Sequence, residues 1–266
     1  MSEDEGALLV FSLIVAAITW CRWWFLVMTR APLGAGLGIR AALAVAPIAC
    51  MLALLCILKF FAASDVRDDG RYLALYTIAG AAWVGLTHGL IGSMGVSLRD
   101  DSLERRNPAA TTLIIAALLA FTLCFAGANI GDGPGWWVVI FSAALSTGTL
   151  AILWATVQRA TALADAVTIE RNMNDAWRAG AFLIASGLIL GRSVAGTWIS
   201  ALETIKDFVA MAWPAFVLTI AELVVGSLRN NDRVAAVRGG SLSGVLIGLA
   251  YLAAAIGYVI YLGWWT

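Results

Sequence analysis

Eight long apolar segments dominate this sequence and constrain its fold more than any other feature. Each is about 20 residues or longer, which is enough for a helix to cross a hydrocarbon layer of roughly 30 Å. The shorter alternating segments typical of a transmembrane β-barrel are missing. The sequence therefore predicts an all-α, multi-pass transmembrane helical bundle in a lipid bilayer. The predicted spans are residues 7–29, 38–62, 71–95, 108–130, 136–158, 176–200, 207–228 and 241–264.

The composition agrees with this class and excludes others. Of the 266 residues, 61% are hydrophobic and only 13% are charged. A soluble domain carries roughly twice that charged fraction. The net charge is zero, and no basic patch is interleaved with aromatic residues, so nucleic-acid binding has no support. We expect no metal site and no cofactor, because His88 is the single histidine and the four cysteines form no C-x-x-C pair.

Basic residues predict the orientation of the spans. Of the seventeen Lys and Arg residues, twelve lie in or beside the connections that follow the first, third, fifth and seventh spans. These are Arg22, Arg30, Arg40, Arg99, Arg105, Arg106, Arg159, Arg171, Arg178, Arg229, Arg233 and Arg238. The positive-inside rule then places these connections in the cytoplasm and both termini on the non-cytoplasmic side of the cytoplasmic (inner) membrane. Seven spans would break this asymmetry in one half, which favours eight.

A weak internal repeat divides the chain into two halves. Ala82-Trp83 and, after thirteen intervening residues, Ser97-Leu98-Arg99 recur as Ala212-Trp213 and Ser227-Leu228-Arg229. Both copies lie on spans that end at the cytoplasmic side, so the halves would be parallel rather than inverted repeats. The sequence therefore predicts two four-span halves, residues 1–131 and 132–266, within one integrated membrane domain.

The stretch of residues 125–137 joins these halves and predicts an ordered hairpin. Its glycines and its proline allow a tight turn. Asn129 and Asp132 can bond to nearby backbone amides. Trp136 and Trp137 begin the next span at the membrane–water interface, the level that indole side chains prefer.

The start of the sixth predicted span resembles a known family. Residues 170–180 read ERNMNDAWRAG and are followed by Gly187 and Gly191. This is similar to an E-x-N…A…G pattern in bacterial membrane proteins that are known only as a domain of unknown function. The resemblance covers about residues 150–266 and departs from the pattern at Asn174, where the family favours a small apolar residue. It implies four-span units, single or in tandem, and no particular activity.

Ionisable residues inside the spans are candidates for function, because charge is costly in a bilayer. Glu222 lies near the cytoplasmic end of the seventh span, and Arg22 and His88 lie at a similar depth on the first and third. If these spans meet, the three residues form one level that could relay protons or ions, or hold a polar headgroup. The alternative is an interhelical salt bridge, with Arg22 reaching to the interface.

On the outer side, Arg192 has acidic residues within reach. We expect it to pair with Glu203 and Asp207 in the short connection between the sixth and seventh spans. Such a pair would pin the two spans together. The alternative for Arg192 is a contact with an anion near the outer face.

Glycines four residues apart mark two spans as packing faces. They are Gly187 and Gly191 on the sixth span, and Gly240, Gly244 and Gly248 on the eighth. This spacing lets two helix backbones approach closely, either within the chain or between subunits. It predicts packing and carries no chemistry.

The sequence favours a non-enzymatic accessory or scaffold subunit of a bacterial membrane assembly, as a homo-oligomer or with other membrane subunits. Enzymatic activity is not expected, since the common catalytic motifs are missing. The alternative is a small-solute or ion transporter or channel that uses the Arg22, His88 and Glu222 level. A transporter predicts a polar cavity open to water at that level, whereas a subunit predicts a dry core and an exposed packing face.

Overall fold

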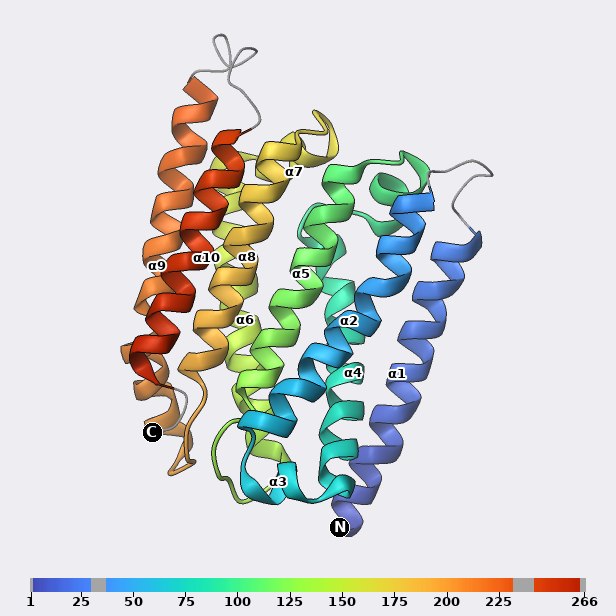
Figure 1. The fold of residues 1–266 in the computed structure, drawn as a ribbon, viewed down its shortest axis with the longest axis vertical. Helices are drawn as coiled ribbons and strands as arrows, with labels where there is room; N and C mark the ends of the chain where they lie inside the picture. Colours follow the sequence, from blue (N-terminus) through green and yellow to red (C-terminus); the bar gives the residue numbers. More distant parts are fainter. Residues whose placement is uncertain (1, 30–36, 232–241, 264–266) are drawn as a thin grey trace.

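Every element of the described chain is helical, as the apolar segments predict. The computed structural model describes residues 2–29, 37–231 and 242–263, and no strand occurs among them. Its long helices run up and down side by side (Figure 1). They are α1 (Glu3–Thr29), α2 (Leu37–Phe61), α4 (Gly70–Ser93), α5 (Pro108–Gly127), α6 (Trp136–Thr161), α8 (Met173–Ser193), α9 (Ala201–Asn231) and α10 (Leu242–Leu262). Three short helices lie in the connections: α3 (Ser64–Asp68), the π-helical η1 (Leu98–Glu104) and α7 (Leu163–Thr168).

Seven of these helices are long and apolar enough to cross a membrane, which confirms the multi-pass membrane class. The long helix that is not among the seven is α8. It carries polar residues, among them Asp175, Arg178 and Arg192, and most of its side chains are buried. Because α5, α6, α9 and α10 pack around it, α8 needs little lipid-compatible surface.

Helices α5 and α8 form the centre of the bundle. They pack against each other along their length, and α8 also packs closely against α10 (Figure 1). Phe121 and Phe125 of α5 and Phe182 of α8 are fully buried. The outer helices instead expose large apolar side chains, such as Phe11 of α1 and Trp213 of α9. This is the pattern of a protein whose surface faces hydrocarbon.

The two ends of the bundle differ in charge. We call the end at which α1, α4, α6 and α9 finish the basic end, because Arg99, Arg105, Arg106, Arg159 and Arg171 lie there. The opposite end, at which α1 begins and α10 finishes, is called the acidic end (Figure 1). Its acidic residues include Glu3, Asp4, Glu5, Asp65, Asp68 and Asp132.

The predicted boundaries between the sixth and seventh spans are wrong. Helix α8 ends at Ser193 rather than at residue 200, and α9 begins at Ala201 rather than at residue 207. The cause is tertiary, because two backbone amides of the connection donate to carbonyls of the hairpin that follows α5. Gly196 donates to Ile130 and Trp198 donates to Asp132, each at 2.7 Å. These bonds hold residues 196–198 against the hairpin, outside α8.

Candidate functional site

The strongest candidate site is a cluster of four buried polar side chains where α8, α9 and α10 meet. Arg178 of α8 donates from Nη1 to Oε1 of Glu222 on α9 at 2.6 Å, and from Nη2 to Oδ1 of Asp175 at 2.9 Å. Tyr251 of α10 donates its hydroxyl proton to the other oxygen of Glu222, Oε2, at 3.1 Å. Glu222 is 0% exposed and Arg178 is 3% exposed. These four residues are called the Arg178 cluster below.

Local sequence explains how the Arg178 cluster is assembled. Asp175 and Arg178 are three residues apart, so they share one face of α8. Small residues let α10 approach that helix. A Cβ added at Gly244 would meet the backbone of Asn174, and one added at Gly248 would meet the side chain of Ala181. Helix α10 therefore packs closely against α8, and from this position its Tyr251 bonds Glu222 of α9.

The chemistry of the Arg178 cluster is that of a closed ion network. One guanidinium lies between two carboxylates, and Tyr251 supplies a further donor to Glu222. Charge-assisted hydrogen bonds of this kind offset the cost of removing the charges from water. The network thereby ties three helices together. In the described part of the chain, no group of three or more His, Cys, Asp or Glu residues is placed to hold a metal ion.

Arg22 and His88 lie in another part of the bundle. His88 of α4 contacts the ring of Trp23 of α1 edge to face, with centroids 4.9 Å apart. Arg22 is exposed on α1. Helix α1 packs mainly against α4, whereas α9 packs against α6 and α8, so Glu222 does not join the other two residues. The three residues of the predicted level, Arg22, His88 and Glu222, do not come together, because Glu222 pairs with Arg178 of α8.

Sequence reasoning missed Asp175, Arg178 and Tyr251. Arg178 lies at the start of the predicted sixth span and contributes there only to the charge asymmetry of the spans; in the structure it belongs to the second turn of α8. The signal that could have revealed it is its spacing from Asp175, which allows an ion pair on one helix face. Tyr251 had no such signal, because its partner lies on another helix.

Arg192 holds the end of α10 instead of the predicted acidic partners. Its Nε donates to the carbonyl of Gly263 at 2.8 Å, and its Nη1 donates to the carbonyl of Ala195 at 3.3 Å. Glu203 pairs with Lys206 at 2.7 Å, and Asp207 is exposed. The predicted pairing of Arg192 with Glu203 and Asp207 is therefore not made. The last carbonyls of a helix lack partners within the helix and attract a cation.

The glycine spacings of α8 and α10 mark close helix contacts within the chain. A Cβ at Gly187 would meet the backbone of Ala120, and one at Gly191 would meet the carbonyl of Leu123, both on α5. Gly244 and Gly248 lie against α8, as described above. Gly240 lies outside the described residues. These four described glycines therefore lie where two helix backbones of the chain approach closely.

The predicted hairpin at the acidic end forms, and it binds the connection between α8 and α9. Gly131 has a φ of +113° and lies against the backbone of Gly196, where no Cβ would fit. The ring of Trp137 contacts that of Trp198 edge to face, with centroids 5.0 Å apart, and Trp136 is half-buried at the start of α6. The side chain of Asn129 differs from expectation. Its Nδ2 donates to the carbonyl of Phe125 at 2.7 Å, so it bonds a carbonyl rather than an amide.

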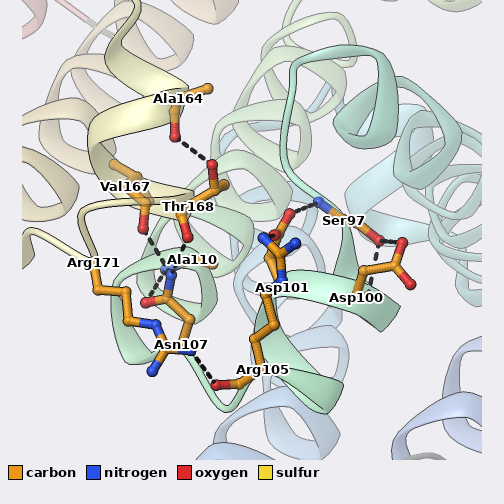
Figure 2. A network of polar contacts seen from close by, with 10 residues as sticks. All are labelled: Ser97, Asp100, Asp101, Arg105, Asn107, Ala110, Ala164, Val167, Thr168 and Arg171. Atoms are coloured by element: carbon orange, nitrogen blue, oxygen red, sulfur yellow. Dashed lines mark hydrogen bonds and ion pairs between the residues drawn. The ribbon is translucent and has the colours of Figure 1, made fainter.

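At the basic end, a second polar network orders the connection between α4 and α5 (Figure 2). The backbone amide of Ser97 donates to Oδ2 of Asp101 at 2.8 Å, and Nη1 of Arg105 lies 3.2 Å from Oδ1 of the same carboxylate. The side chain of Arg99 donates to Glu104 at 2.8 Å. That hydrogen bond raises the pKa of the Arg99 guanidinium above its ordinary value.

Asn107 joins this connection to the one that contains α7 (Figure 2). Its Oδ1 accepts from the amide of Ala109 at 2.9 Å and so caps α5. Its Nδ2 donates to the carbonyls of Val167 at 2.7 Å and Thr168 at 3.3 Å. Arg171 adds a bond from Nη2 to the carbonyl of Arg105 at 3.0 Å. The network therefore fixes both connections as one ordered surface at the basic end.

Comparison with known proteins adds no identity to this geometry. No protein-family model matches the chain, and no curated protein or solved structure matches it. The resemblance of residues 150–266 to a four-span family stays a prediction. Any function must therefore follow from the arrangement of the helices and their polar groups.

Proposed function

We propose that this chain is a non-enzymatic accessory or scaffold subunit of a larger assembly in a bacterial inner membrane. The observation that carries the proposal is the Arg178 cluster. Its guanidinium and the carboxylate of Glu222 bond to each other and to neighbouring side chains, deep inside the bundle. A site that moves a solute needs polar groups that face water and exchange partners. The Arg178 cluster instead suits a fixed junction between helices.

Eight spans are part of this proposal. Helix α8 has 21 residues, which corresponds to about 30 Å and is enough to cross a bilayer. It runs beside α5 and α10 along their length. Its buried polar residues lower its hydropathy without facing lipid. We therefore count α8 as the eighth span.

The two parallel halves are also supported by packing. In the first half, α2 packs against α4 and α5, and α1 packs against α4. In the second half, α8 packs against α9 and α10, and α6 packs against α9. These three pairs correspond one to one under a parallel four-plus-four repeat, whereas the contact of α4 with α5 has no equally extensive counterpart between α9 and α10 in the described residues. The repeat is not uniform, since Ser97 caps the start of η1 whereas Ser227 lies within α9.

The outward face of α9 is a lipid-facing surface against which a neighbouring subunit could pack. This helix packs mainly against α6 and α8, which leaves one side uncovered. Exposed large apolar residues extend along it: Val209, Trp213, Phe216, Val217, Ile220 and Val224. Helix association in a bilayer relies on van der Waals packing of side chains rather than on a hydrophobic driving force.

Ion flux separates this proposal from a transporter or channel. The purified chain in liposomes of phosphatidylethanolamine and phosphatidylglycerol should give no proton or potassium flux above that of protein-free liposomes. A Glu222→Gln variant should match the unaltered chain. Flux that Glu222→Gln abolishes would contradict the proposal and favour transport through the Arg178 cluster.

Assembly size provides the positive test. Extracted with its native lipids in polymer nanodiscs, the chain should appear in particles whose protein mass exceeds the 28.1 kDa of one chain. Substitution of Trp213 and Phe216 by alanine on the outward face of α9 should reduce that mass. A single-chain mass at native expression level would contradict a scaffold role.

A further inference from the structure

A small polar cavity lies at the acidic end, beside the hairpin of residues 128–135. Its volume is about 40 Å³. Five separate parts of the chain line it: α3, α4, the hairpin with the start of α6, the connection after α8, and α9. A water molecule needs roughly 10–15 Å³ of such volume, so the cavity has room for a group with a few non-hydrogen atoms.

Asn129 carries a side-chain acceptor that has no partner. The residue is 3% exposed and is among the lining residues. Its Nδ2 donates to the carbonyl of Phe125, which fixes the orientation of the amide because a carbonyl can only accept. Its Oδ1 is buried and has no hydrogen-bond partner. A buried acceptor without a partner costs stability, so the site favours a ligand that donates a hydrogen bond.

The charges that line the cavity favour a positively charged donor. The carboxylates of Asp65 on α3 and Asp132 in the hairpin belong to the lining, and both residues are exposed. The lining residues include no Lys, Arg or His. Calcium and magnesium ions take six or more ligands, mostly oxygens, and no group of three metal-binding side chains is placed here in the described chain. Two carboxylates and one amide oxygen instead suit an ion with several N–H donors.

We propose that this cavity binds a primary ammonium group, with Oδ1 of Asn129 accepting one N–H bond and the carboxylates of Asp65 and Asp132 supplying the opposite charge. The group could belong to a free small amine, or it could be the end of an ethanolamine lipid headgroup at this membrane face. The shared chemistry is a compact cation with three N–H donors. A quaternary ammonium lacks those donors and exceeds the space. This site is separate from the Arg178 cluster and does not depend on a scaffold role.

Titration calorimetry of the whole chain in lipid-free detergent, with methylammonium chloride as the probe, tests the proposal. We expect saturable binding of methylammonium and none of tetramethylammonium. Asp65→Asn and Asp132→Asn should each weaken binding by about three- to tenfold, the effect of one nearby charge in a partly solvated site. Asp68→Asn is the matched control, because Asp68 is exposed on the same helix as Asp65 and does not line the cavity. It should change the affinity less than twofold.

Two further measurements complete the test. Asn129→Leu, which keeps the approximate volume and removes the acceptor, should abolish binding. Because this change also removes the bond to Phe125, the two aspartate variants carry the test if it fails to fold. In nanodiscs, methylammonium should bind more weakly with phosphatidylethanolamine than with phosphatidylcholine if the natural ligand is a lipid headgroup, and equally if it is a free amine. The proposal would be overturned by any of three results: methylammonium does not saturate a site, tetramethylammonium binds equally well, or both aspartate variants keep the affinity of the unaltered chain.

Discussion

Arg178 and Glu222 join α8 to α9 through an ion pair of 2.6 Å, and both side chains are almost fully buried. Such a pair contributes little over well-packed apolar residues, because desolvation offsets its attraction. Loss of one partner is nevertheless strongly destabilising, since the other charge then stays buried without compensation. The Arg178 cluster is therefore a point at which single substitutions should act strongly.

Loss of the guanidinium should destabilise the bundle. Arg178→Met leaves the carboxylates of Glu222 and Asp175 close together without their cation, and we expect a loss of about 3–5 kcal/mol in the free energy of unfolding. Unfolding in mixed detergent micelles, followed by far-ultraviolet circular dichroism, measures it. Arg99→Met is the control, because Arg99 pairs with Glu104 while half exposed, and it should cost less than about 1 kcal/mol.

The double variant Arg178→Met with Glu222→Gln should recover part of that stability, because it removes one of the two uncompensated carboxylates. If Arg178→Met were as stable as Arg99→Met, the buried network would not be holding the three helices together.

Close contact between α5 and α8 predicts opposite effects of two similar substitutions. At Gly191 an added methyl group meets the backbone of Leu123, so Gly191→Ala should destabilise by about 1–3 kcal/mol. At Gly148 nothing lies within 4 Å of the added atom, so Gly148→Ala should stabilise α6 by up to about 1 kcal/mol. Thermal unfolding of both variants in one detergent measures the pair. Equal effects would show that the two helices do not approach as closely as described.

Asn107→Asp separates the two roles of Asn107 at the basic end. Aspartate keeps an oxygen for the amide of Ala109 and so keeps the cap of α5. It loses the donor to Val167 and places an acceptor against that carbonyl, which should cost roughly 1 kcal/mol or more. Hydrogen–deuterium exchange should accelerate in residues 163–172 and stay unchanged at the start of α5. Acceleration of exchange confined to α5 would contradict a role of Asn107 in joining the two connections.

Arg192→Met should loosen the end of α10. The loss of its bond to the carbonyl of Gly263 should cost roughly 1 kcal/mol and accelerate hydrogen exchange in residues 258–263. Glu203→Gln and Asp207→Asn should leave that segment unchanged, because neither carboxylate bonds Arg192 in this structure. If Glu203→Gln or Asp207→Asn accelerated hydrogen exchange in residues 258–263 as much as Arg192→Met does, the pairing predicted from the sequence would be supported instead.

Sidedness can be tested with cysteines placed at each end. In a variant with Cys21 and Cys56 replaced by serine, Asp68→Cys at the acidic end should react with a membrane-impermeant maleimide added to intact cells with a permeabilised outer membrane. Glu104→Cys at the basic end should react only after the inner membrane is opened. The reverse labelling pattern would contradict the orientation predicted from the basic residues.

The helices could be predicted from the sequence because apolar length is a property of each segment alone. The starts of α5 at Pro108 and of α6 at Trp136 agree with prediction, since proline and interfacial tryptophan mark them locally. The packing faces at Gly187 and Gly191 were also predictable, because glycine spacing along one helix determines which side can approach a neighbour.

What the tertiary structure decided is which helices meet, and with them the partners of every buried charge. Glu222 was predicted as a buried carboxylate with Arg22 and His88 as partners, but α9 packs against α8, so Arg178 is its cation. Arg192 likewise bonds the carbonyl of Gly263 instead of an acidic side chain. The periodicity of a helix indicates which face turns inward, but an ion pair between helices depends on contacts between residues far apart in the chain. The chain alone therefore determined the membrane class and the places where helices can pack closely. Only the folded bundle determined the Arg178 cluster and the polar cavity beside Asn129.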